Sequence, residues 1–142
     1  MTFASITTGT KCTRKKIMKT HLMFTLPWPP SVNTYYRMYM SRLLISRKGR
    51  EYRRTVIGEI CRQKVTQGLS DARISLTIAV YPPDKRKRDL DNLLKPLIDA
   101  MGGAGLFTND EQIDEIMIAR EAVDIDGPGY VRIHLTELVE GK

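Results

Sequence analysis

The strongest constraint on the fold is a strand followed closely by a helix in the middle of the chain. Apolar residues alternate with small or polar ones over residues 74–80, which predicts a strand with one buried face. Pro82 and Pro83 end this strand, and a polar loop follows. Apolar residues then recur every three or four positions over residues 90–101, which predicts an amphipathic helix with Pro96 inside it.

Further elements are expected on both sides of this pair. Residues 23–26 form a short apolar run that stops at a proline cluster, and residues 50–67 have the spacing of a helix. Residues 113–122 and 130–138 have the composition of two strands, which we expect to form a hairpin across the turn at 126–129. The order β–α–β–α–β–β predicts a single small α/β domain with a mixed sheet and two helices.

The length and composition exclude several classes of protein. The chain has 142 residues, 42% of them hydrophobic, which suits one globular domain. No apolar run approaches the roughly 18 residues of a membrane-spanning helix. Cys12 and Cys61 lie far apart without metal-type spacing, which argues against a disulfide scaffold and favours the cytoplasm. Residues 1–20 contain five basic residues and no acid, and we expect a loosely ordered tail before a domain over residues 21–142.

Charge divides the rest of the chain into two unlike parts. Residues 37–95 contain 15 basic and 6 acidic residues, whereas residues 99–142 contain 3 basic and 10 acidic ones. The basic part, which is flanked by aromatic residues, is typical of a surface that binds phosphate. A solvated basic surface without a ligand remains an alternative on charge alone.

The most informative segment places acids beside bases. Asp89 and Asp91 follow a run of four cations (Lys85, Arg86, Lys87 and Arg88) and open the predicted helix. A helix cap would explain one of the two acids. A site for a divalent metal explains both, because Mg²⁺ binds carboxylate oxygens and phosphate while the neighbouring cations hold a phosphate backbone. Lys95 lies one helical turn after Asp91, where it could reach a phosphate or pair with Asp91.

A third acid, Asp110, can return to the same place. The helix over residues 90–101 is roughly 16–18 Å long. Residues 102–109 can span about 26 Å, so they can carry Asp110 back to the start of the helix. A cap in a turn is the structural alternative for Asp110.

At these residues the sequence resembles the RusA family of Holliday junction resolvases, from about residue 24 to the last strand. Three fragments carry the resemblance: LPWPPSVNTYYR at residues 26–37, DKRKRDLDNLLK at 84–95 and DEQI at 110–113. It implies a Mg²⁺-dependent homodimer, with Mn²⁺ as an alternative metal, that cuts four-way DNA junctions in recombination and repair. It also implies a protein of bacterial or phage origin.

The resemblance further implies roles for particular residues. Asp89, Asp91 and Asp110 would bind the metal and act in catalysis together with Lys95. Residues expected to contact DNA are Lys85, Arg86, Lys87, Arg88, Asn92, Tyr36 and Arg37. Asn109 stands where family members can carry an acid. A homodimer also follows from the approximate two-fold symmetry of a four-way junction, which needs two related active sites.

Several alternatives remain open from the sequence. The chain could be a DNA-binding module without catalysis, its acids serving as helix caps, or a D-x-D nucleotide-sugar transferase. The apolar segment at residues 38–45 is a candidate for a subunit interface, for a wedge into the junction, or for a loop that covers the core. We expect Trp28 to pack on the core, Cys61 to be a core residue, and His21 and His134 to be isolated.

Overall fold

The computed structural model describes residues 16–65, 69 and 71–140. Ten elements follow one another along this part of the chain: β1 (Lys16–Pro27), α1 (Val32–Tyr35), β2 (Tyr36–Tyr39), β3 (Arg42–Ile45), α2 (Arg47–Arg62), β4 (Arg73–Tyr81), α3 (Asp91–Gly103), the 3₁₀ turn η2 (Asp110–Gln112), β5 (Ile113–Arg120) and β6 (Tyr130–Glu140). None of the helices in this part is long and apolar enough to cross a membrane.

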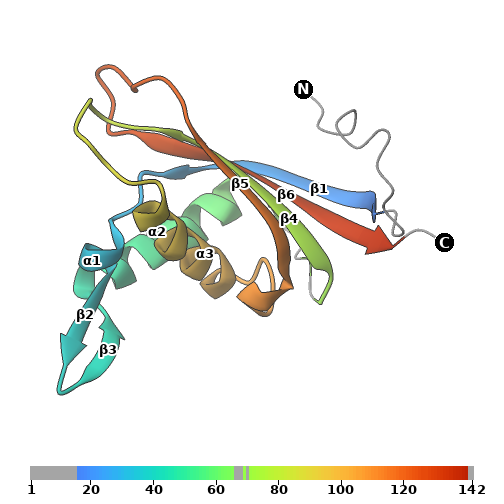
Figure 1. Cartoon of the computed structure of the whole chain (residues 1–142), viewed down its shortest axis with the longest axis horizontal. Helices are drawn as coiled ribbons and strands as arrows, with labels where there is room; N and C mark the ends of the chain where they lie inside the picture. Colours follow the sequence, from blue (N-terminus) through green and yellow to red (C-terminus); the bar gives the residue numbers. More distant parts are fainter. Residues whose placement is uncertain (1–15, 66–68, 70, 141–142) are drawn as a thin grey trace.

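Four strands form one mixed sheet in the order β1-β6-β4-β5 (Figure 1). Strands β4 and β5 run parallel, while β6 is antiparallel to both β1 and β4. The predicted α/β domain with a mixed sheet is therefore confirmed. The short helix α1 adds a third helix to the two that were expected.

The expected hairpin between the last two strands is wrong, because β4 lies between β5 and β6. The connecting segment crosses the end of β4 instead. The backbone N–H of Glu121 donates to the carbonyl of Val80 at 2.8 Å, and that of Asp124 to Pro82 at 2.7 Å. The turn residues do bend the chain, with Asp126 at φ 65°, but they serve this crossing.

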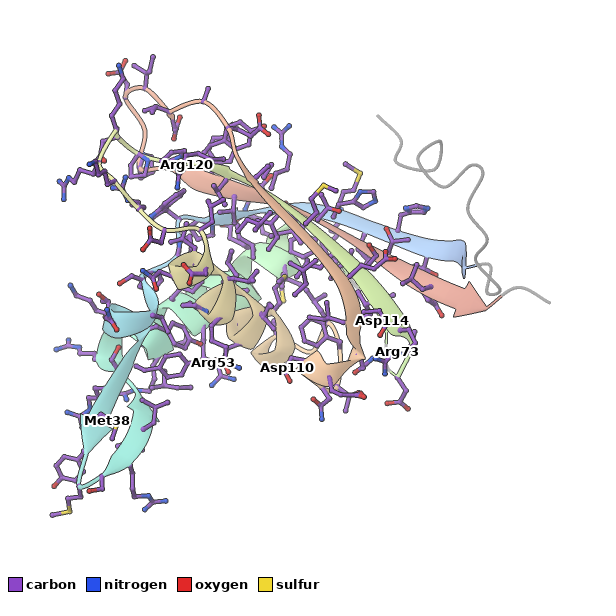
Figure 2. The ribbon with its side chains drawn as sticks, viewed as in Figure 1. Met38, Arg53, Arg73, Asp110, Asp114 and Arg120 are labelled. Carbon is purple, nitrogen blue, oxygen red and sulfur yellow. The ribbon has the colours of Figure 1, made fainter. Side chains whose placement is uncertain are left out.

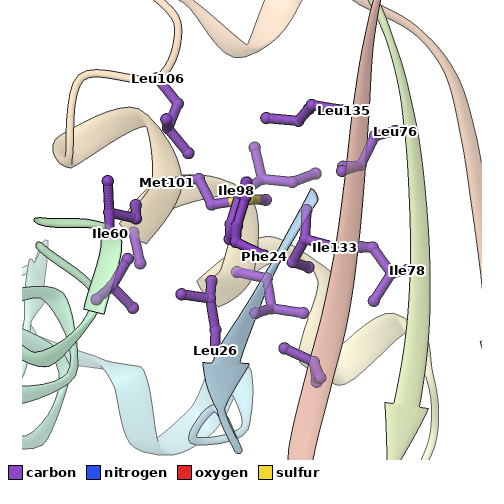
Figure 3. Packing of buried hydrophobic residues seen from close by; sticks show 14 of the residues in the cluster. Phe24, Leu26, Ile60, Leu76, Ile78, Ile98, Met101, Leu106, Ile133 and Leu135 are labelled. Atoms are coloured by element: carbon purple, nitrogen blue, oxygen red, sulfur yellow. The ribbon is translucent and has the colours of Figure 1, made fainter. Parts of the chain in front are cut away.

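The core lies between the sheet and helices α2 and α3 (Figures 1 and 3). Along β4 the burial alternates, and Ile74, Leu76, Ile78 and Val80 are at most 1% exposed. Burying a side chain of this kind stabilises the fold by about 1.5–3 kcal/mol. Apolar residues of α3, including Leu97 and Met101, face the same core, so packing fixes the direction of this helix.

Strands β2 and β3 form a separate two-stranded hairpin that projects away from the sheet (Figure 1). Residues 38–45 were expected to be an apolar segment, and no strands were predicted there. Met40 and Ser41 form the turn with φ of 49° and 62°. Positive φ at both central positions of a two-residue turn suits the twist of a hairpin, although neither residue is a glycine.

Three other expectations also need correction. Residues 16–20 belong to β1, where Lys16 pairs with Glu140, so the domain begins before residue 21, while residues 1–15 lie outside the described residues. Helix α2 ends at Arg62 and leaves Cys61 exposed. His21 and His134 are not isolated, because their ring nitrogens lie 3.1 Å apart across β1 and β6.

Candidate active site

The first part of the candidate site is the start of α3. Asp89 and Asp91 are both exposed there, and neither makes a side-chain hydrogen bond or ion pair within the part of the chain that the structure describes. The N-cap residue is Leu90, which has no capping side chain. Neither acid is therefore a side-chain cap of α3, and the cap interpretation does not account for them.

The second part is an ion pair one turn further along. The ammonium group of Lys95 donates to the carboxylate of Asp110 at 3.2 Å, and both side chains are about half exposed. The hydrogen bond to Asp110 raises the pKa of Lys95, so Lys95 remains a cation. Because Lys95 and Asp91 are four residues apart on one helix, Asp110 reaches the same face of α3 as Asp91.

The turn η2 holds Asp110 in place through its neighbours. The side chain of Asn109 accepts a hydrogen bond from the backbone N–H of Glu111 at 3.0 Å. The buried side chain of Gln112 accepts from the N–H groups of Thr108 and Asn109 and donates to the carbonyl of Ala72. Asn109 is thus the cap of this turn, and Asp110 is free for the contact with Lys95.

The expected meeting of three carboxylates does not occur in this structure. Among the described residues, no group of three or more histidine, cysteine, aspartate or glutamate side chains could hold a metal ion. Asp110 instead lies beside Lys95, which neutralises its charge. Asp89 and Asp91 still fit a hard cation, because Mg²⁺ commonly takes one or two protein carboxylates and fills its other positions with water or phosphate.

The four cations of the basic loop before α3 differ in their surroundings. Arg88 is largely a structural residue: its guanidinium pairs with Asp84 at 2.8 Å and lies 5.5 Å from the centre of the Trp28 ring, and its carbonyl accepts a hydrogen bond from Arg120. The other three cations are exposed: Lys85, Arg86 and Lys87. They are the part of the loop that can meet a polyanion.

Two grooves flank the first half of α3. One, of about 500 Å³, is lined by residues that include Trp28, Lys87, Asp89 and Asn92. The other, of about 700 Å³, lies against the hairpin and includes Tyr36, Arg37 and Lys95. The structure thus brings most of the residues expected to contact DNA to the surface around the acids of α3.

The sequence did not indicate a partly buried network of polar side chains that joins the helices. The hydroxyl of Tyr35 donates to the carboxylate of Asp99, and the guanidinium of Arg53 lies 3.7 Å from the same carboxylate. Burial raises the pKa of Tyr35, and its bond to Asp99 adds to the effect. This network joins α1, α2 and α3. The available signal was the position of Asp99 one turn after Lys95, on the same face of α3.

Comparison with known proteins identifies the family of this chain. The sequence model of the family described as "Endodeoxyribonuclease RusA" matches residues 27–135. The crossover junction endodeoxyribonuclease of Enterobacteria phage HK97 is 43% identical over 115 residues, covering 81% of this chain and 93% of the phage protein. The corresponding proteins of Shigella sonnei and Escherichia coli K12 are 36% and 35% identical, covering 80% of this chain and 92% of theirs.

The chain therefore belongs to the RusA endodeoxyribonuclease family, as the three sequence fragments indicated. Among solved structures, an OmpA-like domain of FopA1 from Francisella tularensis matches with a TM-score of 0.34 at 10% identity, covering 91% of this chain and 84% of that one. That value is too low to relate the two folds.

Proposed function

We propose that this chain is a metal-dependent endodeoxyribonuclease that resolves four-way DNA junctions, in recombination and repair, in the cytoplasm of a bacterial cell. The observation that supports this most is the pair Asp89 and Asp91: two exposed carboxylates that neither cap α3 nor form an ion pair among the described residues, beside a loop with three exposed cations. Exposed carboxylates with open coordination suit Mg²⁺, which commonly takes one or two protein carboxylates and completes its shell with water or phosphate oxygens. The relatives from phage HK97 and Shigella sonnei carry the name of this activity.

The acidic and the basic residues of the site would have different roles in the reaction. Asp89 and Asp91 would hold Mg²⁺, or Mn²⁺ in its place, and Asp110 would join them when Lys95 turns to the DNA. The bound metal would lower the pKa of a water molecule and neutralise charge at the phosphorus. Lys95, which remains protonated, would contact a non-bridging oxygen of the scissile phosphate and stabilise the charge that develops there.

The surrounding residues would position the DNA. Lys85, Arg86 and Lys87 would contact phosphates of one arm, and such contacts make binding strongly dependent on salt. Asn92 and the aromatic ring of Trp28 lie in the groove beside Asp89. Tyr36 and Arg37 lie in the groove beside Lys95. DNA that crosses the start of α3 would therefore meet both grooves.

We further propose that the active form is a homodimer. A four-way junction has approximate two-fold symmetry, and symmetric cutting requires two sites related by a matching axis. The described residues of one chain form one such site.

The test is cleavage of a labelled four-way junction with Mg²⁺. We expect Asp91→Asn to lower the single-turnover rate by at least about 100-fold while junction affinity changes little, because the amide keeps the shape but loses the charge. Asp71→Asn, which changes an exposed acid remote in sequence from the site, is the matched control and should cleave like the parent. Equal cleavage by Asp91→Asn and the parent would contradict the proposed role of Asp91.

A further inference from the structure

The β2–β3 hairpin, residues 36–45, has one apolar face that extends from the core into solvent. In its register Tyr36 lies opposite Ile45 and Met38 opposite Leu43, so these four side chains share one face. Tyr36 and Ile45 are half-buried at the base, whereas Met38 is 65% and Leu43 63% exposed. Figure 2 shows Met38 on the part of the hairpin that projects from the body. A projecting apolar pair of this kind is typical of a binding surface.

This apolar face opens onto the candidate active site. Met38 and Leu43 line the groove of about 700 Å³ together with Tyr36 and Lys95. Lys95 is the residue that contacts Asp110. A molecule held against the hairpin face would therefore lie next to the cation that we assign to the scissile phosphate.

The charge around the hairpin indicates its partner. Residues 31–50 contain five basic residues and no acid: Arg37, Arg42, Arg47, Lys48 and Arg50. The guanidinium of Arg37 lies 5.5 Å from the centre of the Tyr39 ring. Apolar and aromatic side chains among cations suit stacked bases with their phosphates. A second copy of the same hairpin would bring like charges together, which is unfavourable.

The base of the hairpin is held firmly. The backbone N–H of Ser46 donates to the carbonyl of Tyr35 at 2.8 Å, and its hydroxyl donates to the carbonyl of Thr34 at 2.6 Å. A Cβ at Gly49 would lie 2.4 Å from the carbonyl oxygen of Tyr35, so the chain packs as closely as glycine allows. The hairpin therefore presents its tip in a fixed direction relative to α3.

We propose that the β2–β3 hairpin separates stacked DNA bases beside the phosphate that is cut. Met38 and Leu43 contact the exposed bases, while Arg37 and Arg42 hold the flanking phosphates. This inference rests on the proposed nuclease function and adds a determinant of substrate choice. Cleavage of a fully paired junction then depends on the hairpin. Cleavage of a junction whose central base pairs are already broken depends on it less.

The experiment uses a junction with 2-aminopurine at its crossover, whose fluorescence rises when the base loses its stacking partners. Asp91→Asn protein keeps the DNA intact. We expect its binding to raise the fluorescence, and we expect Met38→Ser/Leu43→Ser in the same background to reduce the rise to less than about half, at similar affinity, because phosphate contacts dominate affinity. Met23→Ser, in which an apolar residue of β1 that is 67% exposed is changed, is the matched control.

A second measurement separates a wedge from a merely structural role. With Asp91 restored, Met38→Ser/Leu43→Ser should cut a fully paired junction more slowly than the parent. Mismatches beside the crossover should restore its rate. Two results would overturn the proposal that the hairpin separates bases. One is a fluorescence rise that the double substitution leaves unchanged, and the other is conversion of a dimer to a monomer by that substitution. In either case continued junction cleavage by the parent would leave the nuclease function intact, whereas a parent that neither binds nor cuts the junction would remove both proposals.

Discussion

Asp110 and Glu111 are neighbours in η2, yet their side chains contact different parts of the molecule. Asp110 meets Lys95 on α3 at 3.2 Å. Glu111 meets Arg73 on β4 at 3.1 Å, and the same guanidinium pairs with Asp114 at 2.5 Å and donates to the carbonyl of Glu111 at 2.8 Å. Figure 2 shows Arg73 and Asp114 together at one end of the sheet.

The difference between these two contacts separates structure from function. The guanidinium of Arg73 has its fork occupied by three acceptors, which fixes the start of β5 against β4. Lys95 is a compact charge with three rotatable donors, and among the described residues one carboxylate lies within ion-pair distance of it. It can exchange that partner for a phosphate oxygen with little change in the fold. The same short turn thus anchors the sheet with one acid and serves the site with the other.

The largest effect that we expect from this comparison is on Lys95. Lys95→Ala should lower single-turnover junction cleavage by about 100-fold, because a fixed cation at the scissile phosphate contributes on this scale. The melting temperature should change by no more than about 1–2 °C, since the pair is exposed. Lys95→Arg, which keeps the charge, should retain more activity than Lys95→Ala. Full cleavage by Lys95→Ala would show that the Asp110 contact is only structural.

Arg73 should give the opposite result. Arg73→Ala removes three contacts from β4 to η2 and to the start of β5, and we expect the melting temperature to fall by about 2–4 °C. Junction cleavage should remain within about threefold of the parent, measured well below the melting temperature. Arg62→Ala, in which an exposed i,i+3 pair on α2 is lost, is a matched control and should barely change the melting temperature. A large loss of cleavage in a folded Arg73→Ala protein would contradict the separate roles that we assign to Asp110 and Glu111.

Local patterns in the sequence predicted the elements that build the site. The alternation over β4 and the spacing over α3 are properties of single segments, so residues 74–80 and 90–101 were sufficient. The position of Lys95 on the face of Asp91 followed from helix geometry. Three fragments of sequence were enough to indicate the RusA family.

Contacts between distant segments could not be read in the same way. Composition indicates that residues 113–122 form a strand, but only the packed sheet decides that β5 pairs with β4 instead of β6. The loop after α3 was long enough to bring Asp110 back, and chain length alone does not say which side chain it meets. The bond from Tyr35 to Asp99 spans 64 positions, and neither segment indicates by itself that these two side chains meet.

The smallest effect concerns pH. Burial lowers the pKa of His134, and the neighbouring ring of His21 adds to this. An unfolded chain takes up the proton near its ordinary value of about 6.5, whereas the folded protein does so only at lower pH. The unfolded state therefore binds more protons as the pH falls through and below 6.5, and the free energy of unfolding decreases there.

Urea unfolding at pH 7.5 and pH 5.5 measures this effect. The midpoint of the parent should fall by about a few tenths molar, and that of His134→Gln by less. Lys95 does not contribute over this range, because its hydrogen bond to Asp110 raises its pKa further above neutrality. If the urea midpoint decreases equally for the parent and His134→Gln, groups other than His134 cause the loss of stability at low pH. A larger fall in the urea midpoint for Lys95→Ala than for the parent would instead show that the site contributes to the stability of the sheet. That result would contradict the separate roles that we assign to Asp110 and Glu111.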